Sequence, residues 1–176
     1  MQVIFSDSAY AMVVFETINR IKTETGGVFL GYYENETWYA IETIAPGPKA
    51  VFQSTYFEYD QKYVTRQINK IAQMYRAKLS LIGFWHKHPG SFNEFSSTDD
   101  VLNSDYAKLS DNGAISVLVN IEPDFHITSY HVAYPLRYTK IAYKVGNNLI
   151  PSHLLQLKIK CVSETVENQD ICEKTN

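Results

Sequence analysis

The hydrophobic positions along this chain change repeatedly between a helical and a strand-like period. Near the N-terminus, apolar residues recur every three or four positions after Ser6-Asp7-Ser8, whose short polar side chains suit a helix start. This spacing predicts a first helix ending before Gly26-Gly27, with the apolar series Ala11, Val14, Phe15, Ile18 and Ile21. A second helix is marked on one face by Val64, Ile68, Ile71 and Tyr75. A third is expected to start near Ser96, with inward-facing Leu102, Tyr106 and Leu109.

Runs typical of strands lie between these helices. Residues 28–33 and 37–44 read as two strands, and the turn-forming Glu34-Asn35-Glu36 between them predicts a hairpin. Residues 45–49 contain two prolines and predict a loop. Further strands are expected at 51–57, 79–85, 114–121, 126–133 and 138–144. Because helices and strands alternate along the chain, the pattern predicts one mixed α/β domain.

The domain is expected to cover residues 1–162, and residues 163–176 to form a polar, acidic tail. That last segment has too little apolar material to offset the entropy lost on ordering. A chain of 176 residues with 45% hydrophobic residues suits a single globular domain.

The charge balance and the apolar runs exclude several classes of function. A net charge of −3 argues against binding nucleic acid through its phosphates. No apolar run approaches the roughly 20 residues that a membrane helix needs, and the start lacks the features of a signal peptide. Cys161 and Cys172 are therefore expected to be free thiols in a reducing compartment, and we expect a cytoplasmic protein.

The stretch GFWHKHPGSFNEFSSTDD, residues 83–100, contains groups that suit a metal site. On an extended backbone side chains alternate, so His86 and His88 share a face and Lys87 points away. Asp99, in the first turn of the next helix, can point back toward the end of this strand. Catalytic zinc commonly takes three protein ligands and keeps a fourth position for water, whose pKa it lowers to roughly 7.

Each half of this pattern also has a structural explanation. Alternating histidines occur in many strands, and Ser96 followed by Asp99 is a helix-capping arrangement. Asp100 is an alternative carboxylate, although the spacing from Ser96 favours Asp99. Because both halves together are far more specific than either alone, the combination predicts a metal site.

A metal-activated water also needs a base, and several glutamates are available. Glu24 is the leading candidate because Gly26 and Gly27 follow it, and a glycine backbone can approach other groups closely. Spacing alone does not select it. The other glutamates considered are Glu16, Glu34, Glu36, Glu42 and Glu94.

These residues together resemble the JAMM motif of MPN metalloproteases, a family also called JAB or Mov34. The resemblance rests on Glu24 with Gly26-Gly27, on His86-Lys87-His88-Pro89, and on Ser96-Ser97-Thr98-Asp99. Residues 46–50, with Phe57 and Asp60, resemble the compact prokaryotic branch, which includes bacterial deconjugases of ubiquitin-like proteins.

The resemblance implies a single MPN-like domain whose curved, mostly antiparallel β-sheet is flanked by helices. It implies a zinc-dependent isopeptidase or peptidase with one Zn²⁺ ion bound by His86, His88 and Asp99. Glu24 would act as general base and then as proton donor. Ser96 would donate a hydrogen bond to the oxyanion.

The implied substrate is the C-terminal tail of a ubiquitin-like protein or its conjugate. Such a tail can bind as an added strand at a free sheet edge, and the predicted strand 51–57 is a candidate edge. Phe52 and Tyr56 could grip the tail, although core packing explains them equally well.

Three functions remain open at this point. The chain could be a deconjugase, in an antiviral system with E1- and E2-like enzymes. It could be a processing peptidase for a sulfur-carrier protein of the ubiquitin-like class. It could also be a non-catalytic MPN scaffold that only binds such a partner.

Overall fold

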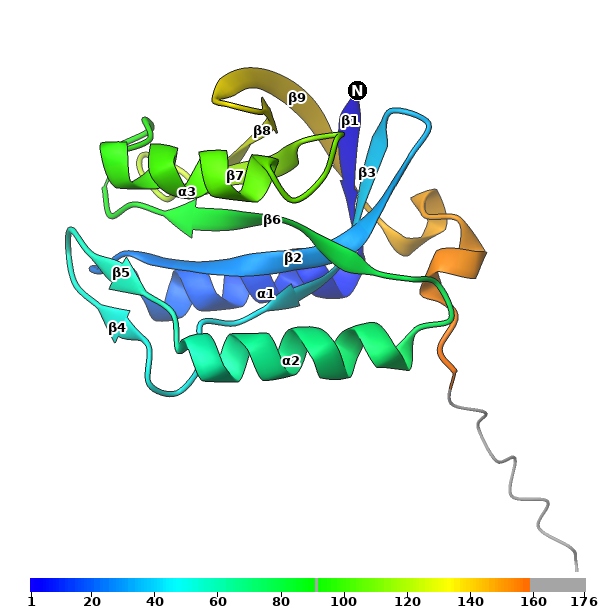
Figure 1. The fold of residues 1–176 in the computed structure, drawn as a ribbon. Helices are drawn as coiled ribbons and strands as arrows, with labels where there is room; N and C mark the ends of the chain where they lie inside the picture. The colour runs from blue at the N-terminus through cyan, green and yellow to red at the C-terminus, as the bar shows by residue number, and fades with distance from the viewer. Residues whose placement is uncertain (91, 159–176) are drawn as a thin grey trace, which may run out of the picture.

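The computed structural model describes residues 1–90 and 92–158, and within them seven strands close into a barrel (Figure 1). Their order around the barrel is β1-β3-β2-β6-β7-β8-β9. The barrel strands are β1 (Gln2–Phe5), β2 (Thr25–Glu34), β3 (Thr37–Ile44), β6 (Ser80–Lys87), β7 (Ala114–Asn120), β8 (His126–Ala133) and β9 (Arg137–Val145). The helices are α1 (Asp7–Asn19), α2 (Gln61–Met74) and α3 (Ser97–Ala107), followed by the short 3₁₀ helices η1 (Asn147–Leu149) and η2 (Ser152–Leu155).

The strand pairing confirms the predicted mixed α/β domain with a mostly antiparallel sheet. Four neighbouring pairs are antiparallel: β2 with β3, β2 with β6, β7 with β8, and β8 with β9. The pairs β1–β3, β1–β9 and β6–β7 are parallel. Because β1 pairs on both sides, it closes the curved sheet. The predicted boundary at residue 162, the tail 163–176, Cys161 and Cys172 lie outside the described residues.

The predicted hairpin of 28–33 with 37–44 is confirmed, and the first strand begins earlier, at Thr25. Asn35 and Glu36 adopt positive φ angles of 49° and 57° at its turn. The single strand predicted over 51–57 is wrong. The segment forms β4 (Val51–Phe52) and β5 (Phe57–Glu58), which pair with each other in a separate two-stranded sheet. The backbone reverses between them, where the N–H of Gln53 donates to the carbonyl of Tyr56 at 2.8 Å.

Helix α1 is present as predicted. Its buried face, however, is not formed by the apolar residues whose spacing predicted the helix. The buried residues are Ala9, Val13 and Thr17, and Val13 joins the cluster inside the barrel. Phe15, Ile18 and Ile21 are exposed. The helix ends at Asn19, where the N–H of Arg20 bonds to the carbonyl of Thr17, so Ile21 follows the helix.

Helices α2 and α3 cover the outside of β2 and β6. Val64 of α2 is buried against Val28, Leu30 and Phe84, as its predicted face requires. Leu102 and Tyr106 of α3 pack against the same cluster. Leu109 was expected to face inward, and this was wrong: it follows the end of α3 and is exposed.

No helix within residues 1–90 and 92–158 combines the length and the apolar composition needed to cross a membrane.

Candidate metal centre

The end of β6 presents two histidines on one side of the strand. Trp85 joins the interior cluster of the barrel, whereas the ring of Phe84 packs outside it. His86 and His88 follow the outward alternation of Phe84, and their ring centroids lie 4.7 Å apart. The predicted common face of the two imidazoles is therefore present, and Lys87 points the other way.

Lys87 is completely buried, although the sequence offered no sign of a role for it. Its Nζ donates to the carbonyl of Arg20 at 2.6 Å and to that of Ile21 at 3.0 Å. Burial lowers the pKa of this lysine to about 8, while the nearby charge of Glu24 opposes the shift. The side chain therefore ties β6 to the segment that leads from α1 to Glu24.

Glu24 lies just before β2, and its backbone is held from two sides. Its N–H donates to the carbonyl of Gln53 at 2.7 Å, which links it to the β4–β5 turn. After it, Thr25 pairs with Lys87 and Gly26 pairs with His86. This register brings the Glu24 carboxylate to the histidines, 62 residues along the chain from His86.

The first turn of α3 supplies Asp99 and Ser96. The Ser96 hydroxyl accepts from the N–H of Asp99 at 3.2 Å, and the N–H of Ser96 donates to Oδ2 of Asp99 at 2.8 Å, which completes a capping box. The Ser96 hydroxyl also donates to this Oδ2 at 2.7 Å. The capping explanation is therefore correct, and the same cap fixes the Asp99 carboxylate against the histidines.

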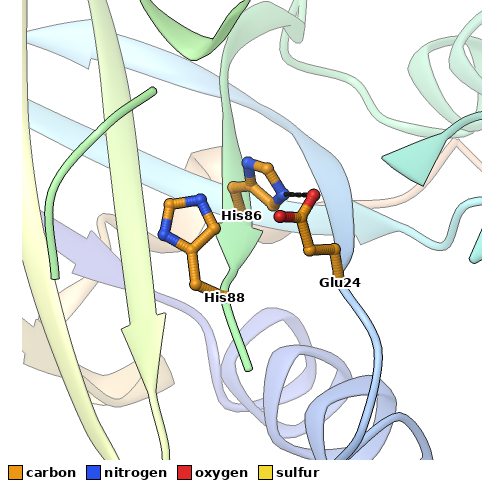
Figure 2. A group of neighbouring side chains, drawn as sticks. All are labelled: Glu24, His86 and His88. Atoms are coloured by element: carbon orange, nitrogen blue, oxygen red, sulfur yellow. Dashed lines mark hydrogen bonds and ion pairs between the residues drawn. The ribbon is translucent and has the colours of Figure 1, made fainter. Parts of the chain in front are cut away.

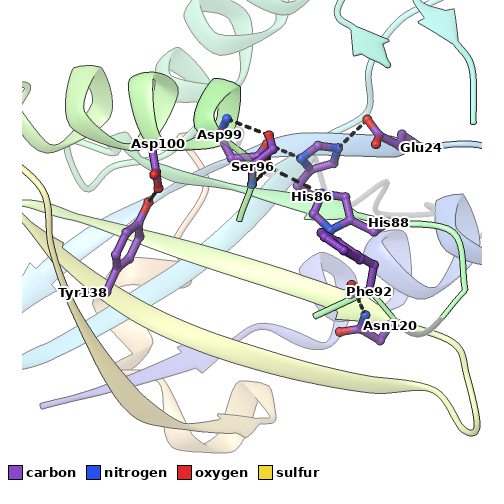
Figure 3. A network of polar contacts seen from close by, with 9 residues as sticks. All are labelled: Glu24, His86, His88, Phe92, Ser96, Asp99, Asp100, Asn120 and Tyr138. Atoms are coloured by element: carbon purple, nitrogen blue, oxygen red, sulfur yellow. Dashed lines mark hydrogen bonds and ion pairs between the residues drawn. The ribbon is translucent and has the colours of Figure 1, made fainter. Parts of the chain in front are cut away.

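Four side chains that could serve a metal site, those of Glu24, His86, His88 and Asp99, meet at short distances (Figure 3). Nδ1 of His86 lies 2.6 Å from Oδ1 of Asp99, and its Nε2 lies 3.2 Å from Oε2 of Glu24. Nε2 of His88 lies 3.4 Å from Oδ2 of Asp99. Glu24, His86 and His88 each offer a ligand atom, and these atoms lie within 4.8 Å of one another (Figure 2). The carboxylate in this set of three is that of Glu24, whereas the expected ligand was Asp99.

The electrostatics of this cluster favour opposite charges side by side. Burial alone would lower the pKa of His86, but hydrogen bonds with Asp99 and Glu24 raise it to about 9. Burial alone would raise the pKa of Asp99, but hydrogen bonds with His86, His88 and Ser96 hold it far below its usual value. A positive charge on His86 is therefore favoured between Asp99 and Glu24, at a place where a bound cation could supply that charge instead.

A cavity of about 490 Å³ opens above these groups. The β4–β5 turn forms one wall with Tyr56 and Phe57, and the segment after β6 forms another with Pro89 and Phe92. The main-chain carbonyl of Phe92 accepts from Nδ2 of Asn120 at 2.6 Å. This bond anchors the second wall to the end of β7, a link for which the sequence carried no signal.

The structure brings Glu24, His86, His88, Ser96 and Asp99 together around this cavity. Tyr56 also lines it, whereas Phe52 is not among its described lining residues. The ring of Phe52 lies under the Arg20 guanidinium instead, 3.8 Å from its carbon to the ring centroid.

The alternative carboxylates have other partners. Asp100 accepts from the hydroxyl of Tyr138 at 2.6 Å and lies apart from the histidines (Figure 3). Glu42 accepts from the Tyr75 hydroxyl. Neither Asp100 nor Glu42 is among the described residues that line the cavity.

The donor set suits a zinc-like cation. Imidazole nitrogens and carboxylate oxygens are the ligands that zinc takes in catalytic sites, and three protein ligands leave a position open. Here two imidazoles and two carboxylates converge at the base of a cavity. One carboxylate can therefore serve as a ligand while the other remains available for proton transfer.

Comparison with known proteins gives two results. Residues 16–132 match the family model described as prokaryotic homologs of the JAB domain. The fold is similar to the solution structure of protein DSY2949 from Desulfitobacterium hafniense, with a TM-score of 0.59 and 12% sequence identity. That similarity covers 81% of this chain and 92% of the other, and at this identity it concerns the fold alone. A search of curated proteins found no match.

Proposed function

Because this chain belongs to the family of prokaryotic homologs of the JAB domain, we propose that it is a metal-dependent peptidase or isopeptidase. The observation that carries this proposal is the convergence of Glu24, His86, His88 and Asp99 at 2.6 to 3.4 Å in one cavity. A pure scaffold would not need all of these groups to be present and in contact.

His86, His88 and Asp99 would hold one Zn²⁺ ion. The ion would supply Lewis-acid polarisation of the scissile carbonyl and activation of water. This assignment leaves Glu24 outside the ligand set. Asp99 is chosen as the third ligand because the helix cap at Ser96 holds its carboxylate in place. Glu24 instead lies on the segment that joins α1 to β2.

Glu24 and Ser96 carry the proton and charge changes of amide hydrolysis. An oxygen of Glu24 takes a proton from the attacking water, and the remaining hydroxide adds to the carbonyl carbon. The Ser96 hydroxyl turns from Asp99 to donate to the carbonyl oxygen as its negative charge develops. Glu24 then delivers its proton to the amine nitrogen as the carbon–nitrogen bond breaks.

For the substrate, the proposal is the C-terminal tail of a ubiquitin-like protein. Within the described residues, β4 and β5 pair only with each other, so each strand keeps one unpaired edge, and Phe57 of β5 lines the cavity. An extended tail without large side chains can add to such an edge and reach the metal centre. A bacterial conjugation system with E1- and E2-like enzymes, such as an antiviral one, would supply such a conjugate. A sulfur-carrier precursor would present a similar tail.

The first test measures bound metal and cleavage in the same preparations. The substrates are a panel of ubiquitin-like proteins, each joined through its C-terminal residue to a reporter protein. We expect stoichiometric zinc and cleavage in the parent chain. Glu24→Gln should keep the zinc but slow turnover by roughly 10² to 10⁴-fold, the usual contribution of a general base. Asp99→Asn should lose the zinc.

The matched control is Glu94→Gln, the same change at an exposed glutamate between His88 and Ser96. It should leave cleavage and metal content unchanged. Loss of zinc from Glu24→Gln with retention in Asp99→Asn would mean that Glu24 is the third ligand. Zinc-free protein that cleaves at the full rate, or zinc-loaded protein that cleaves no member of the panel, would contradict the proposed peptidase.

A further inference from the structure

The outward face of α1 is apolar, and nothing in the described part of the chain covers it. Phe15 and Ile18 are each 61% exposed, and Ile21 just beyond the helix is 56% exposed. Ala11 is exposed on the same face. A surface helix normally turns its large apolar residues inward and its polar residues outward. A contiguous apolar patch of this kind marks an interaction surface more often than a scattered single residue does.

The order of residues along this face makes it complementary to a second copy of itself. When two α1 helices lie antiparallel, centred between Val14 and Phe15, position 11 of one copy faces position 18 of the other. Small Ala11 then lies opposite large Ile18, and Val14 lies opposite Phe15. Alternation of small and large side chains lets two helices approach and interlock.

The charges beyond the two ends of the patch follow the same symmetry. Asp7 begins the helix and Lys22 lies three residues after its end, and both are exposed. In the antiparallel arrangement the end of each helix that carries Asp7 lies beside the opposite end of the other copy, after which Lys22 follows, so opposite charges come near each other at both ends. Antiparallel helices also place opposite ends of their dipoles together. A parallel arrangement would instead bring like charges together.

From this complementarity we propose that two copies of this chain pair through α1 in an isologous dimer. The helix has 13 residues and is therefore about 20 Å long. A contact along a helix of this length buries less surface area than a standard stable interface does. The dimer is therefore weak, and its population depends on concentration. The described residues that line the cavity include none from α1.

The test is the mass of the full-length chain by sedimentation equilibrium over a wide range of concentration. The parent should move from monomer to dimer as concentration rises. Phe15→Glu places a charge at the centre of the contact and should weaken association by about tenfold or more. The matched control is Val101→Glu on α3, where the residue is 65% exposed and the dimer should be unaffected. Circular dichroism and melting curves verify that both variants are folded.

A charge exchange tests the antiparallel geometry independently. Asp7→Lys and Lys22→Asp should each weaken the dimer a few-fold, and the double variant should recover the parental association. Asp7 also accepts a hydrogen bond from the N–H of Asn147 at 3.3 Å, so a purely structural effect of Asp7→Lys would persist in the double variant.

Three results would overturn the proposal. A parent chain that stays monomeric at every concentration is one, and a dimer insensitive to Phe15→Glu is another. The third is a parent that dimerises only after removal of residues 159–176, which would identify that segment as the cover of this face. If the second result came together with a raised KM for cleavage in Phe15→Glu, the face would be assigned to substrate binding.

Discussion

Lys87 shows how a single residue between the two proposed metal ligands His86 and His88 can support the site from the opposite side of the strand. Because side chains alternate along β6, a residue between His86 and His88 must point into the barrel. A buried ammonium group there needs acceptors, and the carbonyls of Arg20 and Ile21 at the end of α1 provide them. The same bonds fix the start of the segment that carries Glu24, so Lys87 is a positioning residue for the proposed base.

Lys87→Met keeps the length and apolar stem of the side chain but removes its donors. We expect a loss of about 1 to 3 kcal/mol in the free energy of unfolding, because the buried side chain no longer donates to the carbonyls of Arg20 and Ile21. We also expect kcat to fall while KM and zinc affinity change little, because only Glu24 is displaced. Urea unfolding, zinc competition and cleavage kinetics measure the three effects.

Lys108→Met is the control for Lys87→Met, because Lys108 is exposed and pairs with Asp105 at the surface. It should leave stability and turnover unchanged. A Lys87→Met protein that is destabilised but turns over normally would limit Lys87 to a purely structural role.

At the scale of elements, the site depends on how closely β2 approaches β6. A Cβ atom on Gly26 would lie 2.6 Å from the carbonyl oxygen of Trp85 and 2.9 Å from the ring of Phe57. The first of these atoms belongs to the backbone of β6, which carries His86 and leads directly to His88, so it cannot move alone. The glycine therefore lets β2 bring Glu24 within contact distance of His86.

Gly26→Ala should push β2 and β6 apart. We expect a loss of about 1 to 3 kcal/mol of stability, the usual cost of overpacking, together with weaker zinc binding and slower cleavage. Ser80→Thr adds one methyl group at an exposed position of the same β6 strand and should leave all three quantities unchanged. Parental metal affinity and turnover in Gly26→Ala would show that the site tolerates a wider strand separation.

At the scale of the whole molecule, closure of the barrel by β1 holds the elements of the site in place. Phe5 is 1% exposed, and its ring contacts Phe29 of β2 and Tyr143 of β9 at centroid distances of 5.4 and 6.0 Å. The N-terminal strand thus joins the strand behind Glu24 to the last strand of the barrel. The metal centre has no residue in β1, yet its geometry depends on this packing.

Phe5→Ala should lower the free energy of unfolding by about 3 to 5 kcal/mol, because the barrel interior cannot collapse fully around the missing ring. Leu109→Ala removes a side chain that is exposed after α3 and should change stability by less than about 0.5 kcal/mol. Urea unfolding of both variants provides the comparison. Equal losses in the two would contradict the assignment of Leu109 to the surface.

Local sequence determined much of this protein, because backbone periodicity and helix capping act over a few residues. The hairpin of β2 and β3, the common face of His86 and His88, and the cap that Ser96 provides for α3 all follow from neighbouring residues. The spacing of Ser96 and Asp99 likewise favoured the carboxylate that contacts the histidines.

Other features were decided only by the tertiary structure. Hydrophobic periodicity predicted α1 but not which of its residues are buried. The buried face depends on which side of the helix packs against the barrel. The short β4 and β5 replaced one expected strand because the chain turns back over the site. Glu24 meets His86 from 62 residues away through the pairing of β2 with β6, and Lys87 finds its acceptors in the same way. These contacts join distant parts of the chain, so short-range patterns could not encode them.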